Sequence, residues 1–260
     1  MLLTINEQIN KIPILKKLYR GLLNRLLVFF KKESFYVNFK ELKLSINIKD
    51  PIDKIIFYSN KYEEEQYNFL CSFIKENEQD YFIDIGANIG LYSLRLSNQF
   101  SKLKILAFEP IPFTFKRLKE NIKLNNLKNI KTFNIGISNS TGLKKMIALK
   151  RKNYIQSGGF SFNIPKRRIS KDEIIQKHQS IIGDRIIKLK NKKLVIKIDV
   201  EGYEEKVLLG INKLLKRNKI LIQIEIFRNN FNKINKLLLK NKFRFIKNFK
   251  NTNDYYYINY

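Results

Sequence analysis

The segment 81–90 constrains the fold of this chain more than any other stretch. An apolar run, 81–85, leads into a turn that contains Gly86 and Gly90, and a helical pattern of leucines follows. Strand, glycine turn and helix in this order are typical of the opening of a nucleotide-binding βαβ unit. Gly86 allows a sharp turn and lets a ligand approach main-chain N–H groups. Asp84 stands at the carboxyl end of the strand, where open α/β sheets bind their ligands.

The spacing of the two glycines indicates which ligand suits the turn. Asn88 occupies the place of the middle glycine in the G-x-G-x-x-G pattern of dinucleotide binders. The turn therefore favours a ligand without a pyrophosphate, and S-adenosyl-L-methionine is such a ligand. A purely structural glycine turn is the alternative.

A second apolar strand ends in an acid. Residues 105–108 run into Glu109, which lies 25 residues after Asp84. A carboxylate in this position can accept hydrogen bonds from both ribose hydroxyls of a nucleoside. The alternative is that Glu109 only precedes the helix that begins at Pro112.

Strand-like and helix-like segments alternate through the rest of the chain. This alternation predicts right-handed crossovers and a parallel sheet, and the last two strands predict an antiparallel hairpin at its edge. Ile137 and Ser138, at the end of the third strand, would line the crevice near an adenine, unless they only form a turn. Strands are expected at 81–85, 105–109, 130–137, 143–149, 194–198, 219–227, 243–247 and 255–260, and helices at 61–76, 90–98, 112–125, 203–216 and 229–241.

The chain divides into an extension and a main domain. Residues 1–50 predict a basic amphipathic helix at 12–32 and a β-hairpin at 35–48. Residues 51–260 form the main domain. Its least regular part, 150–192, is too long for an ordinary connection and predicts an insertion over the active site.

The charge of the chain has two interpretations. The net charge is +28, which suits nucleic acid or an anionic membrane surface. Lysine, asparagine and isoleucine recur in every segment without a basic block, which favours a general drift of composition. The helix at 12–32 could lie on an anionic membrane, although packing on the neighbouring domain is the preferred interpretation.

The single cysteine, the single histidine and the hydropathy of the chain lead to expectations about disulfides, catalysis and location. Cys71 is the only cysteine, so the chain forms no internal disulfide, and burial as a small hydrophobe is expected. His178 stands alone in a polar stretch and predicts an exposed, helical position without a catalytic partner. With no cleavable signal and no run of about 20 apolar residues, the expected location is cytoplasmic, with peripheral contact at the inner membrane face as an option.

Acidic residues follow the strand at 194–198. Asp199 and Glu201 stand at its carboxyl end and precede Gly202, so they are expected to face the ligand crevice. They could act as a general base, or bind a substrate hydroxyl or a cation. Helix capping by Asp199 is the structural alternative.

At this point the chain resembles a known family, the FkbM-family S-adenosylmethionine-dependent methyltransferases. The resemblance covers roughly residues 60–260 and rests on F-I-D-I-G-A-N-I-G at 82–90, A-F-E-P at 107–110, Ile137-Ser138 and I-K-I-D-V-E-G-Y-E at 196–204. It implies the class I methyltransferase fold, an α/β sheet of seven strands with helices on both faces. It also implies O-methylation of hydroxyls, often on sugars or secondary metabolites.

The resemblance assigns residues to two halves of a site. The catalytic half would comprise Asp199, Glu201 and Glu225, one of which removes the hydroxyl proton unless a divalent cation activates the hydroxyl. The S-adenosylmethionine half would comprise Asp84, Gly86, Ala87, Asn88, Gly90, Glu109, Pro110, Ile137 and Ser138.

Two rival functions stay open. A nucleic-acid (RNA) methyltransferase would suit the charge, but base-methylating enzymes typically carry Asn/Asp-Pro-Pro-aromatic where this chain has Asp199-Val200-Glu201-Gly202. The acceptor is therefore expected to be a small molecule or a glycan hydroxyl, with nucleic acid disfavoured. The other rival is a membrane-associated binding module that does not turn over.

Overall fold

The computed structural model describes residues 34–151, 154–156, 159–161 and 168–260. The chain divides into two compact units, and the boundary along the sequence lies between Glu64 and Glu65. The helix expected at 12–32 lies outside the described residues. The division into an extension at 1–50 and a domain at 51–260 stays a prediction.

The first unit contains the expected hairpin. β1 (Ser34–Phe39) pairs antiparallel with β2 (Leu42–Asn47), and α3 (Pro51–Ser59) follows. This helix was not predicted from the sequence. Asp50 and Pro51 start the helix: the Asp50 side chain accepts a hydrogen bond from the Ile52 N–H, and Pro51 suits the first helical position.

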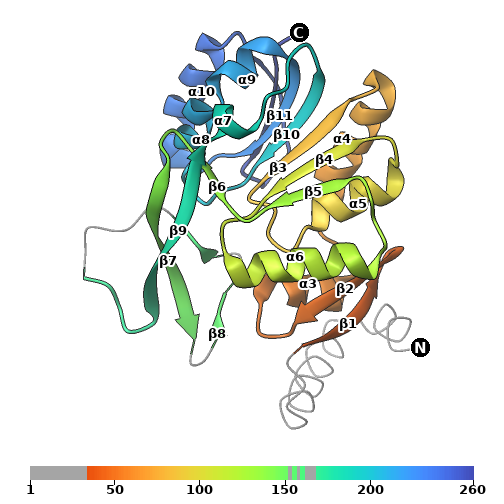
Figure 1. Ribbon diagram of the computed structural model, residues 1–260, viewed down its shortest axis with the longest axis vertical. Coiled ribbons are helices and arrows are strands. Elements are labelled where there is room, and N and C mark those ends of the chain that lie inside the picture. Colours follow the sequence, from red (N-terminus) through yellow and green to blue (C-terminus); the bar gives the residue numbers. More distant parts are fainter. Residues whose placement is uncertain (1–33, 152–153, 157–158, 162–167) are drawn as a thin grey trace. The chain divides into compact units, whose positions relative to one another are not determined.

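The second unit is built on a sheet of seven strands in the order β12-β13-β11-β10-β3-β4-β5, which confirms the predicted fold (Figure 1). β11, β10, β3, β4 and β5 are parallel, and β13 pairs antiparallel with both β11 and β12. The strands are β3 (Tyr81–Ile85), β4 (Lys104–Phe108), β5 (Ile130–Phe133), β10 (Lys193–Ile198), β11 (Lys219–Glu225), β12 (Arg244–Asn248) and β13 (Asp254–Ile258).

Helices cover both faces of this sheet (Figure 1). On one face are α8 (Glu204–Gly210), α9 (Asn212–Arg217) and α10 (Phe231–Lys240), which pack on the isoleucines of β10 and β11. On the other face are α4 (Glu64–Asn77), α5 (Leu91–Gln99) and α6 (Pro112–Leu124). The helix expected at 203–216 is divided at Ile211, whose φ of −113° is not helical.

A second sheet, of four strands, follows β5. Its order is β6-β9-β7-β8, with β6 (Gly136–Ser138), β7 (Gly142–Arg151), β8 (Tyr154–Ile155) and β9 (Glu173–Ile182). The strand expected at 130–137 is therefore two strands in two sheets, divided where the Asn134 side chain donates a hydrogen bond to the carbonyl oxygen of Glu109. The one-turn helix α7 (Gly183–Ile186) leads from β9 to β10.

His178 differs from its prediction. It lies in strand β9, not in a helix, and only 6% of it is exposed. Its ring meets the Phe160 ring edge to face, with 5.7 Å between the centroids. Burial lowers the pKa of His178, so the imidazole is held in its neutral form. The polar residues around His178 belong to a strand whose side chains are alternately exposed and buried. A single histidine in the sequence did not indicate this strand.

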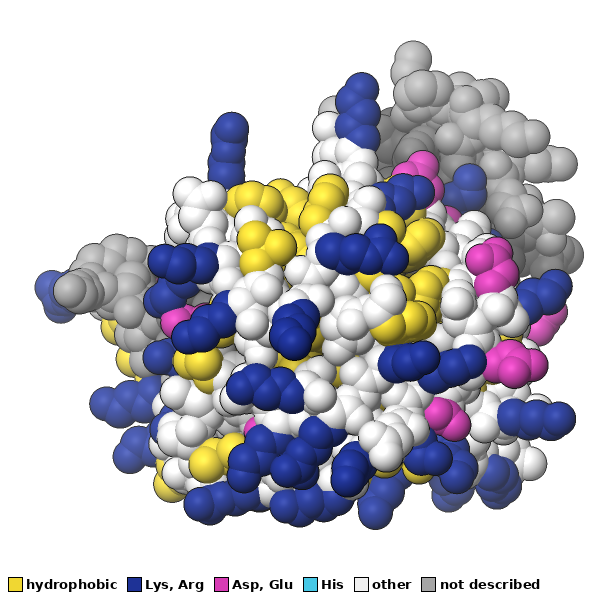
Figure 2. All heavy atoms as spheres, turned by 90° about the horizontal axis from the view of Figure 1, so that it is seen from above, with side chains coloured by type: hydrophobic (Ala, Val, Ile, Leu, Met, Phe, Trp, Pro, Cys, Tyr) yellow, Lys and Arg dark blue, Asp and Glu magenta, His cyan; other side chains and the backbone are white. Residues whose placement is uncertain are grey.

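Lysines and arginines are spread over the surface. In Figure 2 they surround a patch of apolar side chains and extend across the whole visible face, with few acids among them. This distribution agrees with the absence of a basic block in the sequence. In the described part of the chain, every helix is too short or too polar to cross a lipid bilayer.

Candidate active site

The turn after β3 uses its backbone N–H groups internally. Gly86 and Ala87 both donate to the carbonyl oxygen of Phe108 at 3.0 Å, and Gly90 donates to the carbonyl oxygen of Ala87 at 2.8 Å. The N–H of Asn88 donates to Oε2 of Glu109 at 2.9 Å. These four N–H groups are therefore not free to bind a phosphate, which agrees with the ligand without a pyrophosphate that the glycine spacing favours.

Both glycines of the turn are needed for close packing. Gly86 and Gly90 have φ of +89° and +90°, the left-handed region that favours glycine. A Cβ on Gly90 would lie 2.3 Å from Cδ1 of Leu118 in α6, and one on Gly86 would collide with the backbone of Asp199. The turn is thereby pressed against both α6 and the end of β10.

Glu109 is a buried acceptor at the end of β4. Its Oε1 accepts the N–H of Ile111 at 2.9 Å and its Oε2 accepts that of Asn88, while 5% of the residue is exposed. Burial raises the pKa of Glu109 to about 7, against the lowering effect of these hydrogen bonds. Each carboxylate oxygen can accept a second hydrogen bond, so the group can still bind two hydroxyls.

Asn88 offers a further ligand-binding atom. It adopts a φ of +51°, which is uncommon for residues other than glycine and concentrates at functional sites. Its buried Oδ1 has no hydrogen-bond partner among the described residues. An orphaned acceptor beside the free lone pairs of Glu109 fits a ligand that carries several donors, as S-adenosylmethionine does.

The other residues assigned to the cofactor half are more deeply placed. Asp84 is 2% exposed, and its Oδ2 accepts a hydrogen bond from Ser93 Oγ at 2.6 Å, which ties α5 to β3. Burial raises the pKa of Asp84.

Ala87 belongs to a small apolar cluster with α6, and Pro110 is half-buried. Ile137 and Ser138 are buried in β6, with Ser138 Oγ 3.3 Å from the Tyr203 hydroxyl. Their contact with an adenine stays a prediction.

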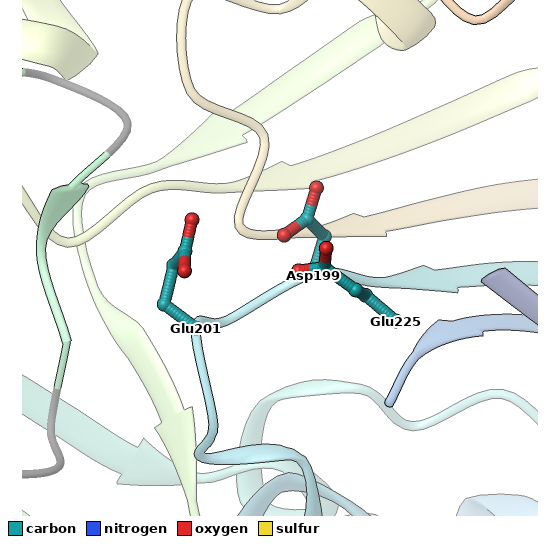
Figure 3. Close-up of side chains that lie close together, drawn as sticks. All are labelled: Asp199, Glu201 and Glu225. Carbon is teal, nitrogen blue, oxygen red and sulfur yellow. The ribbon is translucent and has the colours of Figure 1, made fainter. Parts of the chain in front are cut away.

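The structure brings the three acids of the catalytic half together. Asp199 and Glu201 follow β10, and Glu225 ends β11, the neighbouring strand. One carboxylate oxygen from each residue lies within 4.8 Å of the others, a spacing that one divalent cation could bridge. Figure 3 shows Asp199 beside Glu225, with Glu201 facing them from the turn after β10.

The three acids differ in proton affinity. Burial, the negative charges of Asp199 and Glu201, and a hydrogen bond with Asp199 raise the pKa of Glu225 to about 9. Burial and the charges of Asp199 and Glu204 raise that of Glu201 to about 7. Burial opposes ionisation of Asp199, but Lys197 and the hydrogen bonds outweigh it, so the pKa of Asp199 lies below its usual range.

Lys197 is a site residue that the sequence analysis missed. Its Nζ lies 2.7 Å from Oδ2 of Asp199 and 4.9 Å from the centre of the Tyr92 ring. In the sheet it stands opposite Asp84 on one side and Gln223 on the other. The one signal in the sequence is a lysine among the apolar residues of 194–198, which does not tell whether the lysine is buried; buried lysines are rare unless they are paired.

The turn after β10 is held in an unusual shape. Glu201 has a φ of +52° and Gly202 one of +91°. The N–H of Gly202 donates to Oε1 of Glu204 at 2.8 Å, and the hydroxyl of Ser161 donates to the carbonyl oxygen of Glu201 at 2.6 Å. Ser161 bridges to β7. A residue that is hydrogen-bonded to the second sheet therefore contacts the acidic turn directly.

Strand order, glycine turn and acidic strand ends define the class of protein: this is the class I methyltransferase fold. The model of the methyltransferase FkbM domain matches residues 84–245, more than half of the chain. The chain belongs to the FkbM methyltransferase family, and S-adenosylmethionine is its cofactor.

Two related proteins match this chain in sequence over about half of its length. Methyltransferase 1 of Beauveria bassiana is 27% identical over 149 residues, which are 52% of this chain and 59% of the relative. Hexuronic acid methyltransferase AglP of Haloferax volcanii is 30% identical over 152 residues, 56% of each protein. The matched part thus spans little more than half of these relatives.

Solved structures give a distant likeness. The crystal structure of M. jannaschii TYW2 in complex with AdoMet has a TM-score of 0.45 and 13% identity, over 87% of this chain and 84% of that one. A precorrin-6y C5,15-methyltransferase from Geobacter metallireducens has a TM-score of 0.44 and 15% identity, over 76% and 88%.

Proposed function

We propose that this methyltransferase transfers the methyl group to a hydroxyl oxygen of a sugar, glycan or secondary metabolite. The observation that carries the proposal is the cluster of Asp199, Glu201 and Glu225 at the strand ends beside the glycine turn. Such a cluster suits a hydroxyl, which must be oriented and must lose its proton.

The cofactor half would hold the donor in place. Bound S-adenosylmethionine supplies an electrophilic methyl group. Glu109 would accept hydrogen bonds from its ribose hydroxyls, and the amide oxygen of Asn88 would accept another donor of the ligand. These contacts fix the orientation of the ligand, and orientation accounts for much of the rate gain in a displacement reaction.

Glu201 is the preferred general base. Its pKa of about 7 matches the range in which a base is partly free yet still attracts a proton. Asp199 is held ionised by Lys197, and Glu225 retains its proton at neutral pH. Asp199 and Glu225 would then orient the acceptor hydroxyl, Asp199 as an acceptor and Glu225 as a donor of hydrogen bonds.

A sugar acceptor has support from one relative. The protein from Haloferax volcanii that is 30% identical to this chain is named a hexuronic acid methyltransferase. A sugar presents several hydroxyls to a polar site of this kind. Sugar nucleotides and uronic-acid glycans are therefore the first acceptors to test.

The experiment is a screen of S-adenosylmethionine consumption against sugars, glycans and hydroxylated lipids, followed by Glu201→Gln. This variant keeps the side-chain volume and removes the base, so kcat should fall about 10²-fold or more while cofactor affinity barely changes. Glu205→Gln is the matched control, because Glu205 pairs with Lys233 on the surface of the neighbouring helix. Wild-type turnover by Glu201→Gln, or loss of cofactor binding in it, would contradict the proposed role.

A further inference from the structure

Lys197 places a buried positive charge directly against the acidic cluster. The side chain of Lys197 is 6% exposed, whereas that of its partner Asp199 is 29% exposed. The ammonium therefore approaches Asp199 from the interior of the protein, and the outer side of this carboxylate remains accessible. The Tyr92 ring, 4.9 Å from Nζ, lines the buried side of the ammonium.

The charge of Lys197 acts on four acids of this region. It favours the ionised forms of Asp84, Asp199, Glu201 and Glu225. Three carboxylates with oxygens within 4.8 Å of one another repel strongly in a partly buried site unless a cation or a shared proton compensates them. Lys197 supplies that cation, and the hydrogen bond between Asp199 and Glu225 supplies the shared proton.

We propose that Lys197 is a positioning residue whose ammonium is the built-in counter-ion of the Asp199–Glu201–Glu225 cluster, in the place that a divalent cation would otherwise take. The inference rests on the function proposed above. Lys197 acts through Asp199: it holds this carboxylate ionised and aimed outward, where it can accept the hydrogen bond of the acceptor hydroxyl. An unpaired Asp199 would instead turn toward water or take up a proton.

The first test needs no acceptor, because it measures thermal unfolding of the full chain. Lys197→Met keeps the length of the side chain and leaves Asp199 without its ion pair, so Tm should fall by roughly 5–15 °C at pH 8. Lys197→Met/Asp199→Asn removes the charge that was left unpaired and should recover at least half of that loss. Lys193→Met on the same strand is the control, because the ammonium of Lys193 donates to the carbonyl oxygen of Asn77 and forms no ion pair with the acidic cluster among the described contacts, so Tm should barely change.

The double variant separates an ion pair from simple packing. If the losses in Lys197→Met and Asp199→Asn add, the two residues act independently and the proposal is wrong. If Lys197→Met is insoluble, the proposal requires that Lys197→Met/Asp199→Asn be soluble, and an equally insoluble double variant overturns it. Lys197→Arg keeps the charge and should remain closer to the wild type than Lys197→Met.

The second test uses turnover with an acceptor found in the screen. Lys197→Met should lower kcat at least tenfold with less than a threefold change in the KM for S-adenosylmethionine, and Lys197→Arg should restore part of kcat. EDTA should leave the wild type active. Loss of wild-type turnover in EDTA and its return with Mg²⁺ would overturn the counter-ion role. Failure of Glu201→Gln to slow turnover would instead refute the proposed base and leave the unfolding result intact.

Discussion

The backbone carbonyl oxygen of Asp199 lies 1.9 Å from the position that a Cβ atom on Gly86 would occupy. Real side chains never approach a backbone atom so closely, so only glycine allows this contact. Asp199 also donates its N–H to the carbonyl oxygen of Ile85 at 3.0 Å. The glycine turn after β3 and the turn after β10 that carries the acids are therefore packed as one piece.

Gly86→Ala should separate these two turns. The added methyl group meets backbone atoms of Asp199, which cannot move without displacing the acids, so we expect a loss of unfolding free energy of about 3 kcal/mol or more. Gly142→Ala is the control: Gly142 also has a positive φ, +129°, but has open space around its Cβ position. Denaturant unfolding of both variants checks the prediction, and equal losses would contradict it.

The affinity for S-adenosylmethionine should depend on pH through Glu109. The free protein holds this acid at a pKa of about 7, and hydrogen bonds from ribose hydroxyls favour the ionised form. Affinity should therefore fall by up to tenfold per pH unit below pH 7 and level off above it. Calorimetry between pH 5.5 and 8.5 measures this slope, which should disappear in Glu109→Gln.

Glu109→Gln should also weaken binding at pH 8. Replacing the charged acceptor costs roughly 1–3 kcal/mol for hydrogen bonds to a charged group. Glu76→Gln, an exposed position on α4, is the control and should bind like the wild type. Unchanged affinity of Glu109→Gln would remove this residue from the cofactor site.

Stability should fall as the pH rises, because several buried acids bind protons more tightly in the folded state. Glu109 and Glu201 have pKa values raised to about 7, and Glu225 has one raised to about 9. An acid whose pKa is raised in the folded state contributes its full stabilisation below the pKa of the unfolded chain. It loses this stabilisation as the pH rises through the raised pKa of the folded state. Between pH 7 and pH 9 the decline belongs mainly to Glu225.

Glu225→Gln tests this assignment. The amide can donate a hydrogen bond to Asp199 as the protonated carboxyl does, and it does not titrate. The decline of Tm between pH 7 and pH 9 should therefore be smaller in Glu225→Gln than in the wild type. An unchanged slope would mean that Glu225 is not protonated in the folded state at neutral pH.

Ser161→Ala should impair the acidic turn without touching the cofactor half. The hydroxyl donates to the carbonyl oxygen of Glu201, so its loss should cost about 1 kcal/mol of unfolding free energy and lower kcat. S-adenosylmethionine affinity, measured by calorimetry, should stay unchanged. Ser101→Ala, at an exposed turn, is the control. A fall in cofactor affinity in Ser161→Ala would show that the contact serves the other half of the site.

The sequence predicted the central sheet well because its strands are short apolar runs bounded by turn residues. β3 lies at the predicted residues and β4 within one residue of them; Asp84 is the penultimate residue of β3, and Glu109 directly follows β4. The second sheet was harder to predict. β9 has a run of polar residues at 176–180 instead of an apolar core pattern, and its pairing with β6 and β7 joins residues 24 to 44 positions apart. Local pattern carries no information on such pairings.

The candidate site was likewise predicted only in part. Asp199 and Glu201 were expected at the ligand crevice because they stand at the carboxyl end of a strand, whereas Glu225 was included only as a further candidate base. Lys197 was missed because strand position alone does not tell whether a lysine points into solvent or into the protein. Its register opposite Asp84 and Gln223 exists only in the folded sheet.

The contact between Ser161 and Glu201 has a consequence for how such a protein can change during evolution. The cofactor turn belongs to the seven-stranded sheet, whereas Ser161 comes from a segment that pairs with β7 of the separate four-stranded sheet. Hairpin tips and connections tolerate insertions and deletions far better than central strands do. Descendants of one ancestor could therefore remodel this smaller sheet beside the acidic turn, while the seven-stranded sheet is inherited unaltered.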